Sequence, residues 1–152
     1  VGHYEGGVYN NYWVLIFSYP ENSHTENYRQ EVLDLVNAQR AKYGLTALEM
    51  GDDDLTAAAQ TRAEEIAVVN SHVRPDGSKC FTVLKDYGVT DTPTGENAAW
   101  GSVSPEEVVN AWMNSEGHRA NILNPEARKM SVGYYYNSNS TWGHQWIQIF
   151  TK

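Results

Sequence analysis

The stretch from Trp112 to Leu123 limits the possible folds of this chain most, because it places a carboxylate and an imidazole on either side of a glycine. On a regular helix, residues two apart point about 200° apart, so Glu116 and His118 could not share a site. A helix that ends near Ser115, with Gly117 in the left-handed conformation, would fold the chain back and bring His118 toward Glu116. Such a pair suits metal binding or proton transfer. A buried His118 bonded to a backbone carbonyl, beside a solvated Glu116, would give the same pattern, and these residues alone favour that second interpretation.

Length and charge exclude several classes of protein. The chain has 152 residues, the length of one domain. Its formal net charge of −8 and its unclustered Lys and Arg residues argue against nucleic-acid binding and against adsorption to anionic lipid. No run of about 18 apolar residues is present, so no transmembrane segment is expected. The sequence begins at Val1 without a basic and then apolar leader, so we expect that a signal peptide has been removed or that none was present.

Cysteine usage is sparse. Cys80 is the only cysteine, so no internal disulfide can form. We expect either a small core residue, the commoner role of a lone cysteine, or an intermolecular or reactive thiol.

The first 20 residues repeat a pattern found near the end of the chain. Val1–Tyr4 resembles Val132–Tyr135, and Trp13–Phe17 resembles Trp146–Phe150. We therefore predict strands over residues 1–4 and 12–17 and treat residues 1–22 as a duplicated hairpin ahead of a main domain at residues 23–152. The hairpin would be the tail of a preceding tandem repeat, or it would extend the sheet or mediate a strand-swapped dimer.

The remaining elements follow from apolar periodicity and capping residues. Ser23 and Glu26 have capping-box spacing before a helix over residues 25–43 that Gly44 ends. Three aspartates at positions 52–54 open a second helix with an alanine-rich stripe, and Ser104 with Pro105 opens a third helix that runs to about Ser115. A long loop at residues 73–94 contains a short helical piece at 81–87, and strands are expected over residues 130–136 and 145–151. Three helices and a small antiparallel sheet predict an α+β sandwich.

Four ordered motifs carry a resemblance to a known family. They are Ser71–Gly77, Gly95–Asn97, Trp112–Leu123 and Val132–Tyr134. Together they resemble the CAP superfamily of cysteine-rich secretory proteins, insect venom antigens and plant pathogenesis-related proteins, over about residues 26–152. The short loops and the lack of paired cysteines resemble its bacterial branch. The resemblance implies a three-layer α-β-α sandwich, a secreted, extracellular or cell-wall location, and an open cleft with two histidines and two glutamates.

Residue by residue, the resemblance places this cleft at His72, Glu96, Glu116 and His118. Longer eukaryotic members separate the last glutamate and histidine by a loop, whereas only Gly117 separates them here. His72 and His118 would hold zinc or another divalent metal, and the glutamates would complete the coordination or orient the imidazoles. If Glu96 or Glu116 stayed free, it would be the candidate catalytic base toward metal-bound water.

Three functions compete at this stage. The absence of a nucleophile with a dedicated base favours a binding module that takes a divalent metal and an extracellular ligand, which could be a lipid, a glycan or a protein. A metal-dependent hydrolase of protease type is the first alternative. The second is a structural or adhesion domain in which the four cleft residues form a buried polar network.

Smaller assignments follow from residue type. Asn97 and Asn121 are expected to hold loop backbone, and Arg119 to pair with a carboxylate or a helix end. The tryptophans at positions 100, 112 and 146 are expected in the core.

Overall fold

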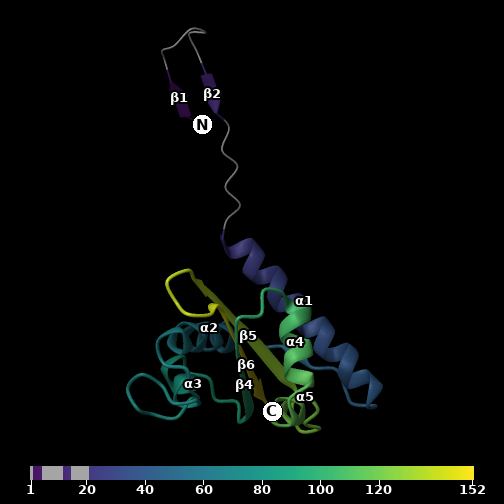
Figure 1. Cartoon of the computed structure of the whole chain (residues 1–152). Helices are drawn as coiled ribbons and strands as arrows, with labels where there is room; N and C mark the ends of the chain where they lie inside the picture. Colours follow the sequence, from purple (N-terminus) through teal and green to yellow (C-terminus); the bar gives the residue numbers. More distant parts are fainter. Residues whose placement is uncertain (1, 5–11, 15–20) are drawn as a thin grey trace.

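A computed structural model describes residues 2–4, 12–14 and 21–152, with side chains from residue 25 onward (Figure 1). Five helices are present in these residues: α1 (Glu21–Lys42), α2 (Asp53–Val68), α3 (Thr82–Asp86), α4 (Pro105–Met113) and α5 (Glu116–Ile122). The strands are β1 (Gly2–Tyr4), β2 (Tyr12–Val14), β3 (Glu49–Met50), β4 (Pro93–Trp100), β5 (Lys129–Asn137) and β6 (Gly143–Thr151).

The main sheet has four strands in the order β3-β5-β6-β4. Strands β5 and β6 form an antiparallel hairpin, and β4 pairs antiparallel with β6 so that Glu96 lies opposite Ile149. The two-residue β3 pairs parallel with β5, so the sheet is not purely antiparallel as the sequence suggested. The parallel pair arises because the extended connector after α1 runs alongside β5 before α2 begins.

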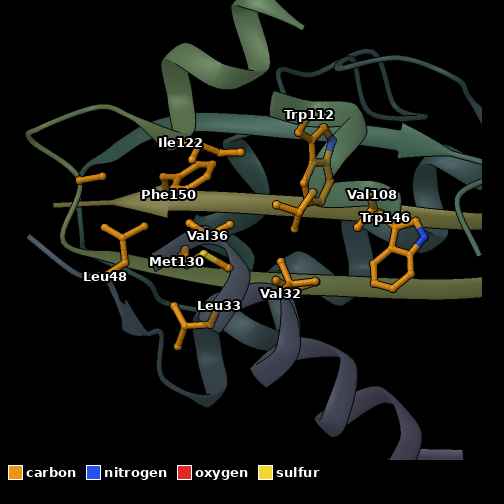
Figure 2. Packing of buried hydrophobic residues seen from close by; sticks show 13 residues of the cluster. Val32, Leu33, Val36, Leu48, Val108, Trp112, Ile122, Met130, Trp146 and Phe150 are labelled. Atoms are coloured by element: carbon orange, nitrogen blue, oxygen red, sulfur yellow. The ribbon is translucent and has the colours of Figure 1, made fainter. Parts of the chain in front are cut away.

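Helices cover both faces of this sheet, which confirms the α+β sandwich. Alternation along β6 sends Trp146 and Phe150 to the face covered by α1, α4 and α5, and Ile147 and Ile149 to the face covered by α2 and α3. Figure 2 shows side chains of the first cluster, among them Val32, Leu33 and Val36 of α1, Trp112 of α4 and Ile122 of α5.

The tryptophans fit their expected place in the core. Trp112 and Trp146 are fully buried, and their indole N–H groups donate to the carbonyl oxygens of Ala98 at 3.3 Å and Ser102 at 2.7 Å. Trp100 is partly buried and donates to Ile66 at 3.1 Å. Each buried indole therefore has an acceptor, as a buried polar group requires.

Small residues let α2 approach the sheet closely. Ala58, Ala59 and Ala63 are fully buried on the stripe that the sequence predicted. A Cβ atom on Gly133 of β5 would overlap the carbonyl of Ala59, so this position accepts only glycine at the present spacing. The close contact sets the distance between α2, which carries charged site residues, and the strands.

Most predicted helix ends are confirmed. Gly44, just after the end of α1, has a φ of 68°. At the start of α2, the Asp52 side chain accepts a hydrogen bond from Leu55 N at 2.9 Å. At the start of α4, the Ser104 side chain accepts from Glu107 N at 3.3 Å, and Pro105 occupies the first helical position. The predicted capping box at Ser23 is wrong, because α1 begins at Glu21 and Ser23 lies inside the helix.

The N-terminal pairing is described only in part. Strands β1 and β2 pair antiparallel, with Gly2 opposite Val14, and form a separate two-stranded sheet. Residues 1 and 15–17 of the predicted hairpin lie outside the described residues, and the proposed boundary after residue 22 stays a prediction, as do the tandem repeat and the dimer. No helix in the described part of the chain is long and apolar enough to cross a membrane.

Candidate functional site

A buried carboxylate and a half-exposed imidazole form the centre of the candidate site. Glu96 lies within β4, and its side chain is 2% exposed, whereas the His72 side chain, after the end of α2, is 55% exposed. His72 Nδ1 lies 2.8 Å from Glu96 Oε1. Because a carboxylate only accepts, Nδ1 carries the proton and Nε2 is left for solvent or a ligand.

Arg62 of α2 completes this pair, although no sequence motif pointed to it. Its Nε donates to Glu96 Oε2 at 2.9 Å, and its Nη2 donates to Glu96 Oε1 at 3.2 Å and to the Ser71 carbonyl at 3.1 Å. Arg62 is fully buried on the alanine stripe of α2. It therefore fixes His72 in two ways, through the carboxylate that His72 contacts and through the backbone just before it.

These contacts keep Glu96 ionised. Burial alone would raise the pKa of Glu96, but hydrogen bonds from His72 and Arg62 outweigh it and hold that pKa below its ordinary value of 4.5. Both carboxylate oxygens are engaged by neighbours. Glu96 is consequently arranged as an orienting group for His72, and the role as general base considered for it from the sequence stays a prediction.

Side chains of alternating charge extend from the buried Arg62–Glu96 pair toward the surface. Glu65 Oε2 accepts from Arg62 Nη1 at 2.6 Å, and Glu65 Oε1 accepts from Arg74 Nη2 at 2.8 Å. Arg74 Nη1 then donates to Asp86 Oδ2 at 2.7 Å. We call this series the ionic ladder: His72, Glu96, Arg62, Glu65, Arg74 and Asp86. It ties the loop that carries His72 to α2 on one side and to α3 on the other.

His118 approaches the same region from α5. It is half-buried, and burial is the main cause of a pKa below the ordinary 6.5, with the nearby His72 lowering it further. Asn97 Nδ2 donates to the His118 carbonyl at 3.1 Å, and Asn121 Nδ2 donates to Asn97 Oδ1 at 2.8 Å and to the Glu96 carbonyl at 3.2 Å. These amides hold backbone of α5 and β4 and not of loops as predicted, and they join α5 to the strand that carries Glu96.

The two imidazoles therefore differ in protonation. The hydrogen bond to Glu96 is the largest influence on His72 and raises its pKa above 6.5, against burial. His118 shifts in the opposite direction. The lowered pKa favours the neutral form of His118, which has a nitrogen lone pair free for a cation, and His72 gains such a nitrogen as the pH rises through its raised pKa.

Glu116 does not join these contacts. The predicted fold-back at Gly117 is wrong, because α4 ends at Met113 and Gly117 lies inside α5 without a positive φ. Glu116 is exposed at the first position of α5 and makes no hydrogen bond or ion pair with the described residues. Its membership of the cleft, and its role as a base, stay predictions. Arg119 Nη1 donates to the Met113 carbonyl at 3.0 Å, which confirms the expected helix-end contact.

Cys80 lies beside the site as an unreactive thiol. It is free and half-buried, and its backbone N–H donates to the His72 carbonyl at 3.1 Å. Burial, with the charge of Glu96, raises the pKa of Cys80 to about 11. The thiol is therefore protonated at neutral pH, which disfavours the reactive alternative.

Few side chains at the candidate site are available to bind a metal ion. Across residues 2–4, 12–14 and 21–152, no group of three or more His, Cys, Asp or Glu side chains is arranged to hold a metal. With Glu96 engaged by Arg62, the cleft offers two imidazoles. Zinc sites in proteins use three or four protein ligands, so these two donors fit only an ion whose remaining positions are filled by water or by a bound ligand.

Comparisons with known proteins agree with one another on the relationship. A family model described as the cysteine-rich secretory protein family, CAP, matches residues 33–150. The chain is 42% identical over 122 residues to the "Uncharacterized protein YkwD" of Bacillus subtilis, covering 79% of this chain and 47% of that protein. It is 30% identical over 124 residues to tobacco pathogenesis-related protein 1C, covering 80% of this chain and 63% of the relative.

Solved structures show the same fold. An extracellular SCP-domain protein from Bacillus anthracis superposes with a TM-score of 0.73 at 26% identity, over 84% of this chain and 41% of that one. An outer surface protein from Borrelia burgdorferi superposes with a TM-score of 0.66 at 25% identity, over 81% of this chain and 90% of that one. The chain thus spans about half the length of the curated Bacillus relative that it matches at 42% identity.

Proposed function

This chain belongs to the CAP family of cysteine-rich secretory proteins, and from that premise we propose that it is a secreted or surface-attached binding module. Its cleft takes a divalent metal ion such as zinc, together with an extracellular ligand, between His72 and His118. The resemblance that the sequence motifs predicted is confirmed at the level of the family. Two of the structural neighbours are named as an extracellular protein and an outer surface protein, which supports a similar location for this chain.

One observation carries the proposal: the buried Glu96 holds His72 with Nδ1 inward, so that a ligand can reach Nε2. Carboxylate-oriented histidines of this kind are typical of metal sites, where the second nitrogen is fixed by an acceptor. His118 adds a neutral imidazole in the same region. When bound, the metal would supply a Lewis-acidic point that anchors an oxygen or nitrogen of the ligand.

The geometry favours binding over hydrolysis. A hydrolase of the kind considered from the sequence needs a free carboxylate near the metal. Glu96 is buried with both oxygens in hydrogen bonds, and Glu116 is exposed without a contact to either histidine. If the chain were instead a structural or adhesion domain, the ionic ladder would be the same. The two functions differ in one measurable respect, which is whether the protein responds to metal.

Isothermal titration with zinc tests the proposal. We expect saturable heat from the wild type and its loss in His72→Ala and in His118→Ala. His144→Ala is the matched control, because His144 is another half-buried histidine whose Nδ1 is engaged, by the Tyr134 hydroxyl at 2.8 Å. Equal heats from the wild type and both cleft variants would refute the metal site and leave the structural network.

A further inference from the structure

After Lys129, its first residue, the β5–β6 hairpin contains no charged residue, although the chain as a whole is acidic. Residues 130–151 contain no Asp, Glu, Lys or Arg, whereas 20% of all residues are charged and the net charge is −8. The turn between the strands reads Asn-Ser-Asn-Ser-Thr at positions 137–141. A surface that selected an ionic ligand would require opposite charge, so this end of the sheet is suited to a neutral partner.

Two aromatic side chains stand open at this end. Tyr136 is 55% exposed and Trp142 is 53% exposed. The Tyr136 ring lies 4.8 Å from the His144 ring, centroid to centroid, and a Cβ on Gly143 would meet a carbon of the Tyr136 ring at 3.3 Å. A Cβ on Gly101 would meet Trp142 Cε3 at 3.7 Å. The Tyr136 ring therefore lies where a side chain at position 143 would crowd it, whereas Trp142 lies at ordinary contact distance from position 101.

Hydrogen bonds and ring contacts support the same end of the sheet. The hydroxyl of Tyr134 lies 2.8 Å from His144 Nδ1, and the Tyr134 ring packs 4.5 Å from the fully buried Trp146. The turn is closed by Ser140 N donating to the Asn137 carbonyl and by Gly143 N donating to Ser140 Oγ, both at 3.0 Å. We call Tyr134, Tyr136, Trp142 and His144 the aromatic rim. The contacts restrict the turn and the Tyr134 and His144 side chains, which reduces the conformational entropy that these groups lose on binding.

We propose that the aromatic rim is a binding site for a neutral glycan. One face of a pyranose ring presents C–H groups, which suit the electron-rich faces of Tyr136 and Trp142. The hydroxyl groups at the edge of the sugar need donors and acceptors, and the exposed Ser138, Asn139 and Thr141 supply both without charge. The rim and the turn thus match both kinds of surface that a sugar presents.

Other occupants fit these features less well. A stable protein interface uses about 20 to 30 residues on each side, several times more than the rim and its turn contain. A membrane-inserting tip would carry apolar residues and nearby Lys or Arg, whereas the tip at residues 137–141 is polar and the chain is acidic. The neutral glycan is the occupant that uses both the rings and the amide and hydroxyl groups.

This proposal is independent of the His72 cleft, and its test separates the two sites. The full chain is titrated with neutral cellohexaose, chitohexaose and mannohexaose, with a heparin hexasaccharide, and with phosphatidylcholine vesicles, while backbone amide NMR signals are followed. Trp142→Ala and Tyr136→Ala are compared with Tyr43→Ala, a tyrosine of similar exposure, 60%, outside the rim. Circular dichroism checks that each variant is folded.

We expect at least one neutral hexasaccharide to saturate, with shifts centred on residues 136–144. Each rim substitution should weaken binding roughly tenfold, the order of one lost ring contact, whereas Tyr43→Ala should leave it unchanged. The proposal is overturned if no neutral sugar saturates, if the shifts centre on the cleft instead, or if Tyr43→Ala weakens binding as much as the rim variants. Preferential binding of heparin or of vesicles at the rim would overturn it as well.

Discussion

The ionic ladder and the aromatic rim lie in the same domain but are built on opposite principles. At the centre of the ladder, charged side chains are withdrawn from water and paired: the side chain of Arg62 is fully buried, that of Glu96 is 2% exposed and that of Glu65 is 15% exposed. Only its two ends, His72 and Asp86, are about half exposed. In the rim, uncharged Tyr136 and Trp142 are more than half exposed. The ladder thus orients the His72 imidazole through its buried side, whereas the rim exposes most of two aromatic side chains to a ligand. Substitutions in the ladder should therefore act on stability and on His72, and those of the two exposed rim rings, Tyr136 and Trp142, on binding alone.

The largest effect should come from breaking the ladder at its buried centre. Arg62→Met removes the partner of Glu96 and leaves a buried carboxylate without compensation. We expect the free energy of unfolding, measured by urea denaturation, to fall by about 3–5 kcal/mol. Arg128→Met, which removes an exposed arginine bonded only to nearby carbonyls, is the control and should change little.

The double variant Arg62→Met/Glu96→Gln sharpens this result. Removing both charges should recover part of the lost stability, because the uncompensated carboxylate is gone. A double variant less stable than the single one would show that the cost lies in packing around Arg62 and not in the charge of Glu96.

The second effect concerns protonation of the two cleft histidines. By NMR, the titration midpoint of His72 should lie above 6.5 and that of His118 below it, and Glu96→Gln should lower the His72 midpoint. Because folding raises the pKa of His72, its contribution to stability is complete below pH 6.5 and is lost as the pH rises through the folded-state pKa. Because folding lowers the pKa of His118, that residue destabilises the fold as the pH falls below 6.5. Equal midpoints would contradict the assigned contacts.

A smaller effect is expected where the rim joins the core. Tyr134→Phe removes the hydroxyl that lies 2.8 Å from His144 Nδ1 but keeps the ring beside Trp146. Thermal and urea denaturation should show a loss of about 0.5–1.5 kcal/mol, the usual net value of one hydrogen bond. A loss of stability as large as that of Arg62→Met would mean that the Tyr134 hydroxyl stabilises the fold as much as the buried Arg62 does.

The smallest effect should follow from substitution of the exposed rings. Tyr136→Ala and Trp142→Ala should each change the free energy of unfolding by no more than about 0.5 kcal/mol, because more than half of each side chain is already in water. Differential scanning calorimetry of both variants beside the wild type measures this. A loss of several kcal/mol would remove the contrast between ladder and rim.

Most of the regular elements and one contact of the candidate site could be predicted from the sequence. Alternating and helical periodicity predicted β5, β6, α2 and α4, because each buries one face on a single core. The motif with Glu96 and the histidine after the second helix were correctly brought together, and they meet at 2.8 Å. Periodicity could not predict the parallel pairing of the two-residue β3, since so short a strand has no pattern of its own.

The charged side chains that contact Glu96 and continue the ladder were harder to predict. Arg62 occupies a position on the alanine stripe of α2 where the pattern calls for a buried residue, and a charge there was the available signal of a buried ion pair. The turn at Gly117 was wrongly predicted because a glycine after a helix usually ends it, whereas here a second short helix, α5, begins at Glu116 and continues through Gly117. The contacts of Arg74 and Glu65 depend on the path of a loop, which local patterns do not specify.

The measurement that tests the central claim most directly is a zinc titration of the full chain followed through its histidine NMR signals. The protein has five histidines, so the cleft pair has internal controls. We predict that the signals of His72 and His118 move together and saturate, while that of His144, held by Tyr134, stays in place. If the cleft signals stay fixed at zinc concentrations that move other histidines, or if none moves, His72 and His118 are part of a structural network and not a metal-binding cleft.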